Sequence, residues 1–281
     1  MFELDNKLTE LAAQIDAALG HAKIADFHYP TAKDASSLKG EFCVVRLTGG
    51  GSGLSYSLAE DHGFDHNSID MPKAGDKAID WVQRFSAPID KTPGPQRAAA
   101  LATINALYNN LLRRTQTALP PADNSFGLSD VQAGDKIGMI GFFPPLVKRL
   151  RGMNVDLTVI ELRRDLEREH PGLIVTTDRR KLAPCNKVLC TSTTLLNQTL
   201  PDMIAAAPNA TEFALLGPSA GCPPEPLYAL GVSTLASAQI MHDDNLWQRL
   251  LDGERLGDAR RKCNLSAHSV PSTLSLIKSL S

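Results

Sequence analysis

The chain has 281 residues, 43% of them hydrophobic, which is enough apolar surface for a buried core in two domains or one large domain. Its formal net charge of −2 provides no broad basic field, so nucleic acid is a poor candidate partner. No apolar run reaches the roughly 18 to 20 residues that span a bilayer, and the start of the chain lacks the features of a signal peptide. We therefore expect a cytoplasmic protein with no membrane partner.

The first half of the sequence predicts a mixture of helices and antiparallel strands. Apolar residues at helical spacing predict helices, and two β-rich runs on either side of a glycine-rich segment predict a hairpin or meander. The predicted helices cover residues 8–19, 79–85 and 97–119, and the predicted strands cover residues 42–47 and 54–58. The short, polar and proline-rich segment 120–125 is the best linker candidate, so we predict a first domain over residues 1–125.

Beyond this linker the pattern changes to alternating strands and helices. The predicted strands cover residues 136–140, 156–160, 173–175, 187–190, 213–216 and 234–241. Helices are predicted at residues 146–151, 193–200 and 245–251. Alternation at this spacing predicts a Rossmann-like parallel sheet flanked by helices. We assign it to a domain of residues 126–265, followed by a tail of residues 266–281.

The residues that follow these strands are the candidates for a ligand site. In an open parallel sheet, ligands bind outside the carboxyl ends of the strands. The sequence gathers glycine, hydroxyl and carboxylate groups there. The predicted ligand-binding residues are Gly138, Gly141, Phe142, Glu161, Thr191, Ser192, Thr193, Asn197, Gly217, Pro218 and Ser219. For the hydroxyl run 191–194, ordinary helix capping is the competing interpretation.

The turn after the first of these strands argues against a conventional dinucleotide site. Gly138 and Gly141 match only part of the G-x-G-x-x-G pattern, and Pro144 and Pro145 remove two N–H donors from the helix start, where a pyrophosphate would bind. Glu161, about 20 residues after Gly141, matches the position that binds a ribose diol. A nucleoside-type ligand such as S-adenosylmethionine therefore stays open, beside the interpretation that Glu161 caps a loop.

Several strings resemble one family. "IGFFPPL", "TSTTLLNQTL" and "LLGPSAGCPPEPLYALGV" resemble the family DUF364, for which heavy-metal chelation is the suggested role. "LTGGGSGLSYSL" and "RAAALATINALYN" resemble the enolase N-terminal-like domain (DUF4213) that precedes it in that family. The resemblance implies a smaller α+β enolase N-terminal-like domain followed by a Rossmann-like domain, with a ligand cleft between or beside them.

Metal ligands would have to come from Cys, His or carboxylate groups that can reach one point. Cys185 and Cys190 flank a predicted strand and would lie roughly 16 Å apart, too far to bind one ion. The remaining candidates form two sets. These predicted metal ligands are Cys190, Cys222 and His242 near strand ends, and His62 and His66 in an acidic segment. The competing interpretations are small buried core cysteines and a solvated acidic loop.

The sequence predicts no nucleophile paired with a base and no paired catalytic carboxylates, so it does not decide whether the protein is an enzyme. We expect a protein of metal metabolism that binds a small polar ligand or a metal chelate at the carboxyl ends of the strands. A heavy-metal ion or a metal chelate is the expected bound group. The alternatives are a nucleoside-cofactor enzyme, of methyltransferase or oxidoreductase type, and a protein that binds and delivers the metal directly. A homo-oligomer is compatible with each.

Overall fold

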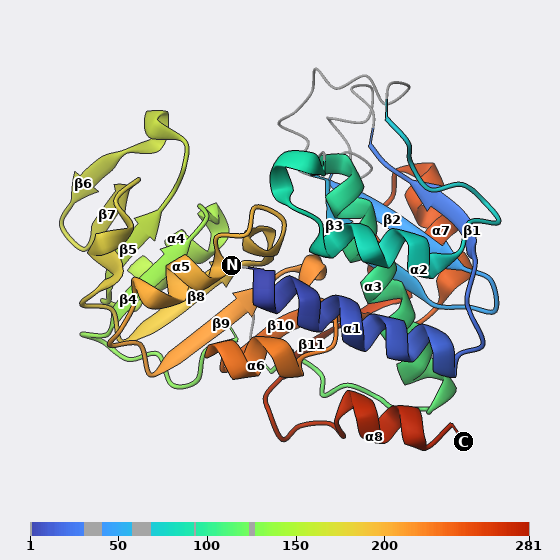
Figure 1. Cartoon of the computed structure of the whole chain (residues 1–281). Coiled ribbons are helices and arrows are strands. Elements are labelled where there is room, and N and C mark those ends of the chain that lie inside the picture. The colour runs from blue at the N-terminus through green and yellow to red at the C-terminus, as the bar shows by residue number, and fades with distance from the viewer. Residues whose placement is uncertain (1, 31–40, 58–68, 93, 124–126, 281) are drawn as a thin grey trace.

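The computed structural model describes residues 2–30, 41–57, 69–92, 94–123 and 127–280, and it shows a mixed α/β fold (Figure 1). The α-helices are α1 (Phe2–Ala18), α2 (Ala78–Val82), α3 (Gly94–Arg114), α4 (Pro144–Arg151), α5 (Leu200–Ala205), α6 (Glu225–Leu230), α7 (Asp243–Asp252) and α8 (Thr273–Lys278). The strands are β1 (Ile24–His28), β2 (Phe42–Leu47), β3 (Ser52–Tyr56), β4 (Lys136–Ile140), β5 (Asp156–Ile160), β6 (Arg168–His170), β7 (Leu173–Thr176), β8 (Lys187–Thr191), β9 (Glu212–Leu216), β10 (Thr234–Ile240) and β11 (Arg260–Leu265). Among the described residues, no helix has the length and apolar character needed to cross a membrane.

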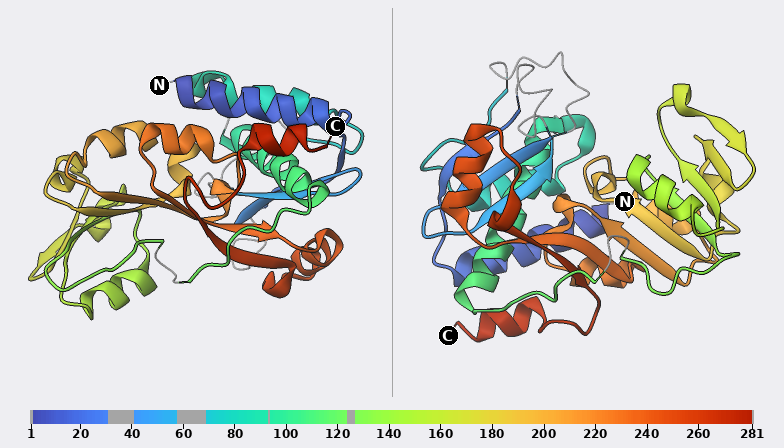
Figure 2. Two further views of the ribbon diagram at one scale, coloured as in Figure 1. Left: turned by 90° about the horizontal axis from the view of Figure 1, so that it is seen from below. Right: turned by 180° about the vertical axis from the view of Figure 1, so that it is seen from behind.

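The larger sheet has eight strands in the order β11-β10-β9-β8-β4-β5-β7-β6. Its inner strands, from β10 to β7, are parallel, and β11 and β6 pair antiparallel at the two edges. Helices α5 and α6 cover one face, and α4 covers the other (Figure 2). The predicted parallel sheet flanked by helices is therefore confirmed for the inner strands, and the two antiparallel edge strands make the whole sheet mostly parallel. The pattern missed β11, because its sequence RRKCNL is too charged to be recognised as a strand.

The predicted helix at residues 193–200 is wrong. The chain instead forms the 3-10 turn η8 (Ser192–Leu195), and α5 begins only at Leu200. Two features separate them: Gln198 has a φ of 57°, outside the helical range, and Pro201 occupies the first turn of α5. A non-helical loop therefore leads away from the end of β8.

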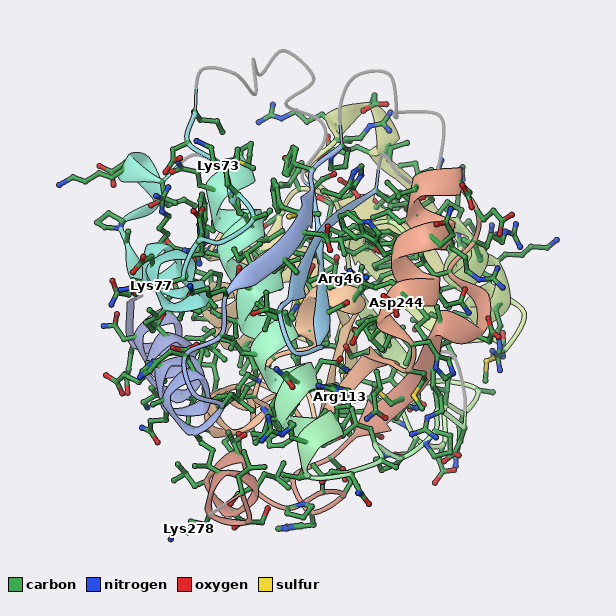
Figure 3. The ribbon with its side chains drawn as sticks, turned by 90° about the vertical axis from the view of Figure 1, so that its right-hand side faces the viewer. Arg46, Lys73, Lys77, Arg113, Asp244 and Lys278 are labelled. Atoms are coloured by element: carbon green, nitrogen blue, oxygen red, sulfur yellow. The ribbon has the colours of Figure 1, made fainter. Side chains whose placement is uncertain are left out.

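The smaller sheet is antiparallel, with the order β1-β2-β3, as expected of a meander. Helix α3 packs against one face of it, and α7 packs against the other, where Leu246 and Leu250 belong to one buried cluster with Phe42 and Val44. Arg46 of β2 and Asp244 of α7 lie side by side (Figure 3), with 2.6 Å between Nη1 and Oδ1. A helix from the C-terminal half thus completes the packing of the N-terminal sheet.

Helix α3 lies at the centre of the molecule and is buried from Arg97 to Leu112. Around it, one apolar core joins side chains of α1, α3 and β2 to side chains of β8, β9 and β11. The segment predicted as a linker pairs with the outer edge of β11, since the Ala122 N–H donates to the Lys262 carbonyl. The domain boundary after residue 125 stays a prediction. Residues before and after this boundary belong to the same apolar core.

The predicted C-terminal tail is folded over its described length. Helix α8 buries Thr273 and Leu276, and the backbone N–H and hydroxyl of Thr273 both donate to the Glu225 carboxylate of α6. Figure 1 shows α8 beside the C-terminal ends of α1 and α3. The tail is therefore part of the packed structure.

Candidate functional site

The turns that follow β4, β8 and β9 touch one another at the carboxyl edge of the large sheet. Gly141 has a φ of 86°, and a Cβ at this position would lie 3.1 Å from Cγ2 of Thr191. Gly217 has a φ of 123°, and a Cβ there would lie 2.5 Å from Oγ of Ser192. These four predicted residues form a continuous row, and both glycines are needed for backbone conformation and for space.

Glu161 at the end of β5 is engaged by the backbone of the site itself. Its Oε2 accepts a hydrogen bond from the Phe142 N–H at 2.9 Å, and its Oε1 accepts one from the Arg163 N–H at 3.1 Å. The Phe142 ring lies 4.9 Å from the Arg168 guanidinium. The geometry supports loop capping by Glu161 more than ribose binding.

The hydroxyl run after β8 mostly satisfies its own turn. Thr191 Oγ1 accepts a hydrogen bond from the Thr193 N–H, and Thr194 Oγ1 donates to the Thr191 carbonyl at 2.7 Å. Asn197 Oδ1 accepts from the N–H and hydroxyl of Thr199. Ser192 differs, because its hydroxyl is buried without a partner. The capping interpretation therefore explains Thr191, Thr193 and Asn197.

Two of the predicted ligand residues lie inside the packed structure. Ser219 is completely buried, and its Oγ accepts a hydrogen bond from the Tyr56 N–H of β3 at 2.9 Å. Gly138 is within β4, where a Cβ would lie 2.8 Å from Cδ2 of Leu182. Both positions serve packing, because β3 and the segment after β7 cover them.

A groove of about 240 Å³ borders Gly217 and Pro218. Small residues of β10 and Leu216 of β9 line it, together with Tyr56, Arg260 and Lys262. An adjoining cavity of about 460 Å³ shares the two basic residues and adds Arg255 and Glu41. We call these joined cavities the basic groove. Their total size is in the range of small-molecule sites.

Three basic side chains and one carboxylate, that of Glu41, line this groove. Within the described part of the chain, Arg255, Arg260 and Lys262 form no ion pair. Burial and the negative charge of Glu41 raise the pKa of the Tyr56 phenol, and the positive charge of Arg260 opposes the rise. These residues are not among those predicted from the sequence, although the i, i+2 spacing on a strand places Arg260 and Lys262 on one face.

Another cavity, of about 550 Å³, lies at the opposite edge of the sheet. It is lined by residues at the starts of β4, β5 and β7, among them Lys136 and Asp156, together with Cys185. None of the predicted ligand residues lines it. The basic groove therefore lies at the expected location, the carboxyl ends of the strands, and this cavity does not.

The structure does not assemble the predicted metal ligands Cys190, Cys222 and His242. Both thiols are completely buried, whereas His242 is exposed at the start of α7. In the ranges that the structure describes, no group of three or more His, Cys, Asp or Glu side chains is placed to hold a metal. The other two candidates, His62 and His66, lie outside the described residues.

The cysteines are expected to be unreactive in the folded protein. All five are free and buried. Burial raises the pKa of Cys185 to about 11 and of Cys190 and Cys222 to about 12, so the nucleophilic thiolate is rare at pH 8. Iodoacetamide at pH 8, followed by intact-mass analysis, should leave the native protein unmodified and label all five thiols in guanidinium. Rapid labelling of native Cys190 or Cys222 would contradict this burial.

Comparison with known proteins shows which family this chain resembles. The DUF364 model, described as heavy-metal chelation, matches residues 124–267, just over half of the chain. An uncharacterized protein of Methanocaldococcus jannaschii is 28% identical over 197 residues, which are 68% of this chain and 71% of that protein.

Two crystal structures of DUF364 proteins of unknown function are similar in fold, each at 19% identity. The Pyrococcus horikoshii protein has a TM-score of 0.68, covering 92% of this chain and 99% of its own. The Desulfitobacterium hafniense protein has a TM-score of 0.65, covering 93% and 98%. With a family model that spans half of its length and the same fold in these relatives, the chain belongs to the DUF364 family.

Proposed function

We propose that the protein binds a small anionic chelator, with or without its metal ion, in the basic groove. The observation that carries this proposal is the pair of unpaired cations, Arg260 and Lys262, beside a strand-end turn of the parallel sheet. Gly217 and Pro218 supply a floor without bulky side chains, and Tyr56 offers a hydroxyl. Chelators built from carboxylates are negatively charged, and cationic side chains recognise them by charge-assisted hydrogen bonds.

The donor set favours a chelate over a bare metal ion. Heavy metals prefer thiolate, imidazole and carboxylate ligands, and the described residues bring no three of these together. A chelator that already surrounds the ion needs from the protein only complementary charge and shape. The family description of heavy-metal chelation agrees with a ligand of this kind.

We also infer that the large sheet is Rossmann-like. Its parallel strands follow the order β7-β5-β4-β8-β9-β10, which is the doubly wound order, with the reversal between β4 and β8. Gly141 and Thr191 lie at this reversal, and the row of turns leads from them to the basic groove. The enolase N-terminal-like (DUF4213) identity of the first half rests on its sequence strings.

A nucleoside-cofactor enzyme has less support. Glu161 already accepts two backbone hydrogen bonds, and Pro144 and Pro145 open α4 in place of N–H donors. The phosphate and ribose contacts of such a cofactor would both need rearrangement. Direct metal delivery is likewise less supported by the described side chains.

Isothermal titration with zinc citrate, metal-free citrate and zinc chloride tests the proposal. We expect citrate, with or without zinc, to bind the wild type, and Lys262→Glu to weaken its binding at least about tenfold, because the new carboxylate repels the anion. Lys278→Glu is the matched control: Lys278 is exposed on α8 (Figure 3) and lines neither part of the groove.

Two results would reject the proposed site. Equal affinity of the wild type and the Lys262→Glu variant would remove the basic groove from binding. Tight stoichiometric binding of zinc chloride alone would instead favour direct chelation by the protein.

A further inference from the structure

We propose that a small buried cavity between α3, β3 and β10 is a binding site for water. The cavity measures about 20 Å³, and Ser52, Asn105, Tyr108 and Ser237 line it. These residues come from both sides of the predicted domain boundary. Each of these residues is at most 8% exposed.

Four polar atoms in this lining are buried and have no partner. They are Ser52 Oγ, Asn105 Oδ1, Tyr108 OH and Ser237 Oγ. Burying such groups without hydrogen bonds is unfavourable, and almost all buried polar groups in folded proteins have partners. Four of them around one cavity point to an occupant that hydrogen-bonds.

The orientation of Asn105 defines what the occupant must offer. Its Nδ2 donates to the Leu54 carbonyl at 2.7 Å and to the Ser219 carbonyl at 3.1 Å. These bonds place the amide nitrogen on the carbonyl side, so Oδ1 is an acceptor that needs a donor. The three hydroxyls can each donate or accept. Water, with two donors and two acceptors, suits this combination.

Volume and charge both favour water over other small ligands. A water molecule needs roughly 10 to 15 Å³ of such space and two to four polar partners, and this cavity offers about 20 Å³ and four. None of the described residues that line it is charged, so an ion would lose its hydration without a compensating charge. The bound water connects α3 and β3 to β10, directly behind the Pro218 and Ser219 turn that Asn105 holds.

The test compares two serines that both carry a buried, unpartnered hydroxyl. Ser237 lines the cavity and Ser192 does not. If water is bound, Ser237→Ala removes a hydrogen bond to it and lowers the urea midpoint, whereas Ser192→Ala removes only an unsatisfied hydroxyl and leaves the midpoint unchanged or raised. Both changes delete a single oxygen, so both variants should fold.

A high-resolution crystal structure of the wild type gives the direct readout. We expect an ordered water within hydrogen-bond distance of Asn105 Oδ1. Oxygen-17 relaxation dispersion should show a shorter residence time for one internal water in Ser237→Ala than in Ser192→Ala. A cavity without electron density, or equal midpoints for the two variants, would overturn the proposal.

Discussion

Replacing Arg97 by methionine is expected to destabilise the protein by about 3 to 5 kcal/mol, because the change leaves the Asp5 carboxylate buried without its counter-charge. Arg97 is 1% exposed, and its Nη2 lies 2.8 Å from Oδ2 of Asp5. Burial raises the pKa of Asp5 and lowers that of Arg97, and each charge opposes the shift of the other. The two ions therefore depend on each other in the folded state.

The Arg97 guanidinium also holds the loop that follows β8. It donates to the carbonyls of Leu195 and Leu196 at 2.9 and 2.8 Å, while Gln198 donates to Asp5 at 2.6 Å. This loop continues from the hydroxyl run at the edge of the sheet. Loss of Arg97 should therefore loosen the row of turns after β4, β8 and β9 as well as lower the stability of the folded protein.

Urea denaturation measures this effect, with Arg84→Met as the control. Like Arg97, which lies over the Phe85 ring, Arg84 lies over an aromatic ring. Arg84 pairs with an aspartate, Asp70, at 2.6 Å, but both partners of this pair are partly exposed. A pair of this kind contributes about 0 to 1 kcal/mol. Similar losses of unfolding free energy in the two variants would contradict the larger contribution of the buried pair of Arg97 and Asp5.

Changing Gly53 to alanine is expected to cost about 3 kcal/mol, at the upper end for overpacking. A Cβ at this position would lie 2.0 Å from the Ala102 carbonyl oxygen and 2.3 Å from the Ala106 nitrogen. Both are backbone atoms of the buried helix α3, so no side chain can rotate away. Strand β3 would have to move off the helix, and Tyr56 would move with it.

Thermal and urea denaturation of Gly53→Ala and Gly152→Ala separates this contact from a general effect of glycine replacement. Gly152 ends α4 with a φ of −69°, and a Cβ there would come no closer than 3.2 Å to its own helix. Alanine is compatible with that conformation and should be neutral or slightly stabilising. A neutral Gly53→Ala variant would show that the β3 and α3 backbones are not in close contact.

The parallel strands of the large sheet could be predicted because the pattern that indicates a buried strand lies within a few neighbouring residues. Apolar runs such as 137–140 and 157–160, each bounded by a turn, indicate buried strands from neighbouring residues alone. Parallel strands then place their following turns at one edge, and Gly141, Thr191 and Gly217 do lie in a row there. Periodicity also indicated the long helix that became α3, although not that it would be buried on all sides.

The rest was decided by contacts between residues far apart in the sequence. Ser219 looks like a rim residue in its own segment, yet β3, more than 160 residues earlier, covers it. The charged strand β11 forms because β10 pairs with it, and only this pairing places Arg260 and Lys262 beside Gly217. A hydrophobic pattern indicates how deeply a segment is buried but not which distant segment buries it. The sequence by itself therefore determined the parallel sheet and the edge at which its turns lie. The tertiary packing decided which residues at that edge remain open to a ligand.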